Sequence, residues 1–313
     1  MFADIGDARV RYEDRGVGEP VVLLGGFGAN AEFWEGTIAE LEGFRVITLD
    51  NRGVGSTEYS GRFSVADMAD DVNALLGLLG IGSAHVLGWS MGSQIAQCLA
   101  VRHPDRVRTL TLVASYLRFP LRADYVLREL TGMVLEGRAP MDCLAIAVNA
   151  LCVPEAAFDE LDSRGLRMTV PERMEKPGGL MDQLDAMSTY SGEELEGLDV
   201  PTLVVHGRRD AMIECDDGAA VAGRIPDSEL LLVDAGHNVP FGTYRDRFLD
   251  LVRRGRRPPG PSSSSRADSA RPCTRRRTQC SPASRRTPSR APGPTGAPPC
   301  IQRTSQASPP RPR

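Results

Sequence analysis

One serine occupies a sequence setting that can make a hydroxyl group nucleophilic. Residues 85–92 read H-V-L-G-W-S-M-G. The apolar start predicts a buried strand, and the residues after Ser90 follow a helical pattern. In a tight turn from a strand into a helix, Gly88 and Gly92 avoid the clash that a Cβ atom would cause. This G-x-S-x-G pattern therefore predicts that Ser90 is an exposed nucleophile at the end of a strand.

A serine hydroxyl is a weak nucleophile at neutral pH, so this chemistry also needs a general base and a carboxylate that orients the base. Asp210 follows one predicted strand, and His237 follows the next. The carboxyl ends of parallel strands share one edge of a sheet, which favours a common crevice for Ser90, Asp210 and His237. Asp234, three residues before His237, is the alternative carboxylate.

The elements that must position these residues alternate between short apolar runs and amphipathic stretches. This alternation is typical of an α/β fold, in which helices cover a parallel sheet. Residues 64–79 predict a helix with Ser64 as its N-cap. The opening residues predict an antiparallel hairpin that turns at Gly6 and Asp7. The predicted strands are 21–24, 45–49, 85–87, 109–113, 202–205 and 229–233.

The alternation of strands and helices is interrupted once. Residues 117–198 are rich in Met and Leu and contain no convincing strand. We therefore predict a helical insertion there, which divides the core into residues 1–116 and 199–257.

The end of the chain differs in composition from the rest. Residues 258–313 contain 11 Arg, no Lys, 13 Pro and a single acidic residue, Asp268, and they carry a charge of +10. With one large aliphatic side chain they cannot form a core, so we predict disorder. Two hypotheses remain for this tail: an arm that tethers the protein to nucleic acid or an anionic surface, or a stretch translated without selection, which we favour.

The body of the chain is acidic. The whole chain has a net charge of −4, so residues 1–257 hold 26 bases and 40 acids, a net charge of −14. This charge argues against nucleic acid as the partner of the core. No apolar run reaches the roughly 18 residues of a membrane span, and the first residues lack the features of a signal peptide. We therefore expect a cytoplasmic protein with no membrane partner, and its oligomeric state stays open.

Taken together, the motifs resemble those of the α/β-hydrolase superfamily, and the resemblance covers about residues 1–255. It implies the α/β-hydrolase fold, with a mostly parallel central sheet, helices on both faces and residues 117–198 as a helical cap. The motifs that carry the resemblance are G-W-S-M-G at 88–92, G-R-R-D at 207–210 and G-H at 236–237, each after a predicted strand.

The resemblance also implies roles for individual residues. Ser90 is the expected nucleophile, His237 the general base and then the acid, and Asp210 the carboxylate that fixes the imidazole tautomer. The backbone N–H groups of Phe27 and Met91 are expected to form the oxyanion hole, which stabilises negative charge on a carbonyl oxygen during the reaction.

One position departs from the family, and the pocket is less well specified. Gly25 stands where the family commonly has His, so the loop at residues 24–28 is expected to be less rigid. For the substrate pocket the sequence offers residues that are equally suited to core packing. The candidates are Gly26, Trp34, Trp89, Met133 and Met187.

We therefore expect a serine hydrolase that cleaves an ester, lactone, thioester or activated carbon-carbon bond of a small to medium apolar substrate, through an acyl-enzyme and without a metal or organic cofactor. On the same fold, a cofactor-free haloperoxidase, a polyketide-tailoring cyclase or lyase, and a non-catalytic ligand-binding module are alternatives. An NAD-binding domain is a further alternative, because residues 26–31 match G-x-G-x-x-A and Asp50 ends the next predicted strand.

Overall fold

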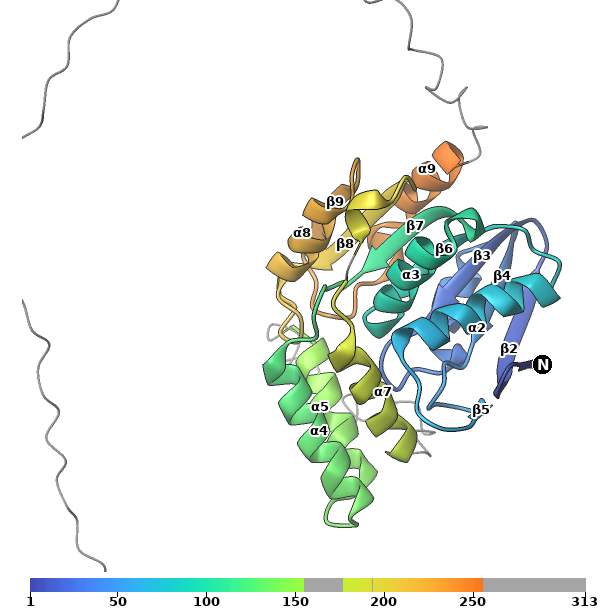
Figure 1. Cartoon of the computed structure of the whole chain (residues 1–313). Coiled ribbons are helices and arrows are strands. Elements are labelled where there is room, and N and C mark those ends of the chain that lie inside the picture. Colours follow the sequence, from blue (N-terminus) through green and yellow to red (C-terminus); the bar gives the residue numbers. More distant parts are fainter. Residues whose placement is uncertain (155–176, 193, 256–313) are drawn as a thin grey trace, which may run out of the picture. The chain divides into compact units, whose positions relative to one another are not determined.

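A nine-stranded sheet forms the centre of the part of the chain that the structure describes (Figure 1). The structure is a computed structural model that describes residues 1–154, 177–192 and 194–255. These residues belong to one unit, Met1–Gly260. The predicted disorder of residues 258–313 lies outside the described residues, as do residues 155–176 of the predicted insertion.

The strands follow the order β1-β2-β4-β3-β6-β7-β8-β9, and β5 pairs with β2. Strands β3, β4 and β6 to β9 are parallel, whereas β2 is antiparallel to β1, β4 and β5. The predicted α/β fold with a mostly parallel sheet is confirmed. The bounds are β1 (Phe2–Ile5), β2 (Ala8–Gly16), β3 (Glu19–Leu24), β4 (Phe44–Leu49), β5 (Glu58–Tyr59), β6 (Ala84–Trp89), β7 (Val107–Val113), β8 (Thr202–Gly207) and β9 (Glu229–Val233).

Helices cover both faces of the sheet, as the side chains of β3 show. Val22 and Leu24 pack in the hydrophobic cluster that contains residues of α2 and α3, whereas Val21 and Leu23 pack in the cluster that contains residues of α9. Successive side chains of a strand point to opposite faces, so both faces of this apolar strand are buried. The helices of the core are α1 (Glu35–Ala39), α2 (Val65–Leu78), α3 (Met91–Arg102), α8 (Cys215–Arg224) and α9 (Arg245–Gly255), with 3-10 helices η1 (Ala31–Trp34), η2 (Pro104–Arg106) and η5 (Phe241–Thr243).

Further helices lie between β7 and β8 in the sequence. They are α4 (Leu121–Leu135), α5 (Met141–Cys152) and α7 (Pro177–Thr189), followed by the 3-10 helix η4 (Leu195–Gly197). Helix α4 packs against both α5 and α7, and the three helices lie together at one end of the sheet (Figure 1). None of the described helices is long and apolar enough to cross a membrane.

Candidate active site

Ser90 lies on the sharp turn between β6 and α3. Its backbone has φ = 55° and ψ = −121°, a conformation that a residue with a side chain rarely adopts. A Cβ atom on Gly88 would overlap the carbonyl oxygen of Gly92, and one on Gly92 would overlap the carbonyl oxygen of Leu24. The two glycines of the motif therefore allow the strand and the helix to approach closely enough to hold Ser90 in this turn.

Three side chains from three strand ends form a hydrogen-bonded chain. The Oγ of Ser90 donates to Nε2 of His237 over 2.9 Å, and Nδ1 of His237 donates to Oδ2 of Asp210 over 2.8 Å. Ser90 follows β6, Asp210 follows β8 and His237 follows β9. Because a carboxylate can only accept, Nδ1 carries the proton and Nε2 keeps the lone pair that faces the serine. In this geometry an imidazole can remove the proton of a hydroxyl group.

Ser90 is more enclosed than the sequence predicts. It is only 3% exposed, so the expectation of an exposed nucleophile is wrong. The loop after β3 packs directly against it: a Cβ atom on Gly26 would lie 3.0 Å from the Cβ of Ser90 and 2.7 Å from the ring of Trp89. Gly26 therefore belongs to the wall of the site, and any larger residue there would displace one of its neighbours.

The carboxyl group of Asp210 is fully buried and contacts both His237 and His206. Burial alone would raise the pKa of this carboxyl. The charge of His237, together with hydrogen bonds from His206, His237 and the backbone N–H of Ile213, outweighs burial and holds the pKa well below its usual range. Asp210 is therefore ionised at neutral pH, which favours the Nδ1–H tautomer of His237 and stabilises its protonated form.

Two residues near Asp210 have other partners. Asp234, the alternative carboxylate, has a side chain that is 76% exposed and pairs with Arg209 over 2.9 Å, so it does not orient His237. His206 is fully buried, and its Nε2 lies 3.1 Å from the carbonyl oxygen of Ile213 and 3.2 Å from Oδ2 of Asp210. The ring of His206 thus packs behind the loop that carries Asp210.

Two backbone N–H groups near Ser90 are available to bind an anion. Met91 is the first residue of α3, and the N–H groups of a first helical turn have no partner within the helix. No hydrogen bond joins the N–H of Phe27 to another described residue. The loop that carries Phe27 follows β3, whose parallel neighbour β6 leads to Ser90.

Asp50 holds the far end of the loop after β3. Its Oδ1 accepts from the N–H of Ala31 over 2.9 Å, and its Oδ2 accepts from the N–H of Ser56 over 2.8 Å. Asp50 is 2% exposed. An NAD-binding domain would direct this carboxylate to the ribose hydroxyls, so the buried, backbone-bound Asp50 counts against that alternative.

Known proteins resemble this chain in both sequence and fold. The family model of the alpha/beta hydrolase fold matches residues 19–242. This chain belongs to the α/β hydrolase fold family. A pimeloyl-[acyl-carrier protein] methyl ester esterase of Neisseria meningitidis is 29% identical over 242 residues, which are 74% of this chain and 91% of that protein.

Solved structures resemble this chain over most of its length. A thermophilic esterase from Thermogutta terrifontis has a TM-score of 0.66 and 28% identity, covering 79% of this chain and 92% of that one. A bromoperoxidase from Bacillus anthracis has a TM-score of 0.65 and 22% identity, covering 78% of this chain and 94% of that one, and it shares the fold.

Within this family, the departure at Gly25 is accompanied by other loop contacts. The side-chain amide of Asn51 donates to the carbonyl oxygen of Gly25 over 3.0 Å. The N–H of Gly28 donates to Oε1 of Gln183 over 3.0 Å. The expected loss of rigidity is thus opposed by hydrogen bonds from residues distant in the sequence, which no local motif reveals.

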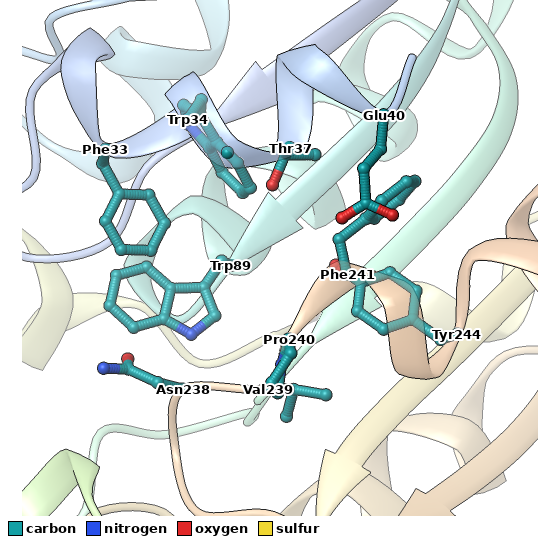
Figure 2. Close-up of a pocket in the computed structure, with 11 residues that line it drawn as sticks. Phe33, Trp34, Thr37, Glu40, Trp89, Asn238, Val239, Pro240, Phe241 and Tyr244 are labelled. Atoms are coloured by element: carbon teal, nitrogen blue, oxygen red, sulfur yellow. The ribbon is translucent and has the colours of Figure 1, made fainter.

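The predicted pocket residues do not all lie in one place. Trp34 and Trp89 line a cavity of about 330 Å³ together with Phe33, whose ring stacks on Trp89 with 4.4 Å between centroids (Figure 2). The described residues that line this cavity include none of the three in the hydrogen-bonded chain. Met187 is 1% exposed within the core cluster, and Met133 is half-buried near the end of α4.

Sequence reasoning missed the contacts that hold the His237 loop. The indole N–H of Trp89 donates to the carbonyl oxygen of His237 over 3.1 Å. The carbonyl oxygen of Cys152, the last residue of α5, accepts from the N–H groups of His237 over 3.0 Å and Asn238 over 3.3 Å. The backbone of this loop is therefore anchored both to the serine turn and to the helices between β7 and β8.

Proposed function

We propose that this protein is a serine hydrolase that cleaves a carboxylic ester, or a lactone, thioester or activated carbon-carbon bond, through an acyl-enzyme on Ser90. The observation that carries the proposal is the hydrogen-bonded chain from Ser90 through His237 to the buried carboxylate of Asp210, with distances of 2.9 and 2.8 Å. A serine, a base and an ionised orienting group in this order are what nucleophilic catalysis by a hydroxyl requires.

Acylation starts when the Oγ of Ser90 attacks the carbonyl carbon of the substrate and its proton moves to Nε2 of His237. The carbonyl oxygen becomes an oxyanion, which the N–H groups of Phe27 and Met91 stabilise; each such donor typically lowers the barrier by about 3 kcal/mol. The bond to the leaving alcohol then breaks, and the alkoxide takes the proton from His237. Asp210 stays ionised throughout and stabilises the transient imidazolium.

Deacylation repeats these steps with water as the nucleophile. Nε2 of His237 removes a proton from water, which attacks the ester carbonyl of acylated Ser90. The second oxyanion occupies the same two N–H groups, and its collapse releases the acid and returns the proton to Ser90. The chain's own residues supply every group in this cycle, so it needs no metal or organic cofactor.

An ester is the favoured substrate among these classes. Two relatives in sequence and structure, the pimeloyl-[acyl-carrier protein] methyl ester esterase and the Thermogutta terrifontis esterase, carry esterase names. On the side of Ser90 that faces the loop after β3, Gly26 has no side chain and the ring of Trp89 is apolar. These surroundings suit a small to medium apolar acyl group, and the helices of residues 117–198 form its cap.

Ser90→Ala is the decisive variant. A fluorophosphonate probe, located by peptide mass spectrometry, should label Ser90 of the wild type, and p-nitrophenyl esters of increasing acyl length should be hydrolysed. Ser90→Ala should lose both the label and the turnover. Ser93→Ala is the matched control: Ser93 is buried in the first turn of α3, and its hydroxyl donates to the backbone carbonyl oxygen of Ser90 over 2.6 Å. Because that hydroxyl does not bond to the Oγ of Ser90, this variant should keep the label.

Two outcomes would contradict the proposal. One is ester hydrolysis that Ser90→Ala retains. The other is wild-type protein that binds esters without labelling or turnover, as a binding module would. A bromination assay with hydrogen peroxide tests the haloperoxidase alternative, and bromination without esterase activity would favour it.

A further inference from the structure

Gln183 joins the helices between β7 and β8 to the loop after β3. Its side chain lies on α7 and is fully buried. Its Oε1 accepts from the N–H of Gly28 over 3.0 Å, and its Nε2 donates to the carbonyl oxygen of Arg52 over 2.8 Å. Gly28 directly follows Phe27, so this amide contacts the peptide next to a proposed oxyanion-hole donor.

A contact between two glycines brings Gln183 within reach of the loop. A Cβ atom on Gly179, four residues earlier on α7, would overlap the carbonyl oxygen of Gly53. Gly53 has φ = +93°, and a Cβ atom there would lie 3.1 Å from Cγ of Gln183. Glycine in a helix costs about 1 kcal/mol relative to alanine. Here it permits backbone-to-backbone packing that a side chain would prevent.

We infer that Gln183 is a positioning residue of the oxyanion hole, an inference that rests on the proposed function. The N–H of Phe27 and the N–H of Gly28 belong to consecutive peptide planes, which are related by the φ and ψ angles of Phe27 alone. Gly28 itself has φ = +71° and is intrinsically free to rotate. By holding the Gly28 plane, Gln183 restricts the direction of the Phe27 N–H.

The chemistry of the amide explains why glutamine suits this position. It must accept from Gly28 and donate to Arg52 at the same time, which a neutral amide of this length does in its only protonation state. An ionised glutamate has the same shape but lacks the donor and would place a charge at a buried site. Methionine is of similar length but leaves both backbone groups without their partner.

The test compares Gln183→Glu and Gln183→Met with a matched control, Tyr59→Phe. The hydroxyl of Tyr59 donates to Asp182 over 2.8 Å, the residue next to Gln183 on α7. Tyr59→Phe therefore removes another hydrogen bond between α7 and the core without touching residues 25–28. For each protein, kcat and KM are measured with a p-nitrophenyl ester, and thermal unfolding is recorded.

Two further readouts separate positioning from a general loss of structure. A trifluoromethyl ketone forms a hemiketal with Ser90: the Oγ bonds to the carbonyl carbon, its proton moves to Nε2 of His237, and the C=O π electrons go to the oxygen, which becomes an oxyanion. The Ki of this ketone therefore reports on the oxyanion hole. Hydrogen exchange of residues 25–31 reports on the Gly28 N–H and does not depend on activity.

We expect both Gln183 variants to lower kcat by about 10- to 100-fold with little change in KM, to raise the ketone Ki by a similar factor, and to speed exchange at Gly28. Tyr59→Phe should leave kcat, the ketone Ki and the exchange rate at Gly28 near their wild-type values. The inference is overturned if the Gln183 variants keep wild-type kcat and Ki, or if Tyr59→Phe lowers kcat and raises Ki to the same extent. If the wild-type protein neither hydrolyses esters nor is labelled at Ser90, the proposed function fails instead. In that case, unchanged hydrogen exchange at Gly28 in the Gln183 variants would separately refute the hydrogen bond between Gln183 and Gly28.

Discussion

The Ser90 site is held from two sides that differ in chemistry. On the core side, the loops after β8 and β9 supply Asp210 and His237, which can carry charge and move a proton. On the other side, α5 and α7 supply the carbonyl oxygen of Cys152 and the amide of Gln183, both neutral and both bound to backbone. The charged groups are thus the ones proposed to take part in the reaction, whereas the neutral groups hold the backbone of the loops that surround Ser90.

Asp210→Asn breaks the core side and should have the largest effect. An asparagine amide can donate to Nδ1 of His237, which would move the ring proton to Nε2 and leave no lone pair for Ser90. We expect kcat to fall about 10⁴-fold, as it does when this carboxylate is replaced in Ser-His-Asp enzymes. The measurement is steady-state hydrolysis of a p-nitrophenyl ester.

Asp234→Asn is the control for this variant, because Asp234 is the nearby carboxylate that pairs with Arg209 at the surface. It should stay within about twofold of wild type, as surface substitutions usually do. Equal losses in the two variants would mean that His237 does not depend on Asp210.

Gly179→Ala tests the other side of the site and should have a smaller effect. The new Cβ would overlap the carbonyl oxygen of Gly53 and push α7 outward. Overpacking of this kind typically costs about 1–3 kcal/mol, and the shift would loosen the bond from Gln183 to Gly28. We expect a lower melting temperature and a kcat about 10-fold lower.

Gly132→Ala provides a matched control on α4. A Cβ atom on Gly132 would meet nothing within 4 Å, so alanine should stabilise the helix by up to about 1 kcal/mol and leave kcat unchanged. If Gly179→Ala also raised the melting temperature, the close packing of α7 on the Gly53 loop would be refuted.

The same two sides differ in how far sequence could predict them. Gly88 and Gly92 lie within one short motif, so their close approach can be read locally, and the capping box of Ser64 with Asp67 at the start of α2 is equally local. The six parallel strands were predictable because their apolar runs are distinctive, and β1 with the start of β2 was predictable from the turn at Gly6 and Asp7. Strand β5 has two residues and leaves no such pattern.

The contacts that α5 and α7 make with the site could not be predicted from the sequence. Gly53 and Gly179 lie on different elements far apart in the chain, and neither has a neighbouring residue that predicts the other. Gln183 resembles any polar residue on an amphipathic helix until the helix is docked. The cavity beside Trp34 and Trp89 likewise depends on tertiary structure, because residues of η1 and of the loop that follows β9 line it together. Local patterns thus predict the elements and the reactive residues, but not the packing that adjusts them.

Acid unfolding gives the smallest expected effect and sharpens the comparison, because Asp210 can be protonated in acid whereas the side chain of Gln183 carries no charge. The pKa of the Asp210 carboxyl is lowered in the folded protein. Ionised Asp210 therefore adds to the free energy of unfolding above the ordinary aspartate pKa of about 3.9, and this stabilisation is lost as the pH falls towards the pKa of the folded state. The difference in unfolding free energy between wild type and Asp210→Asn, measured with urea, should therefore narrow between about pH 5 and pH 3. Gln183 carries no charge, so the difference between wild type and Gln183→Met should stay constant over that range. If the difference in unfolding free energy between wild type and variant narrowed equally for Asp210→Asn and Gln183→Met, the two sides would not be electrostatically distinct.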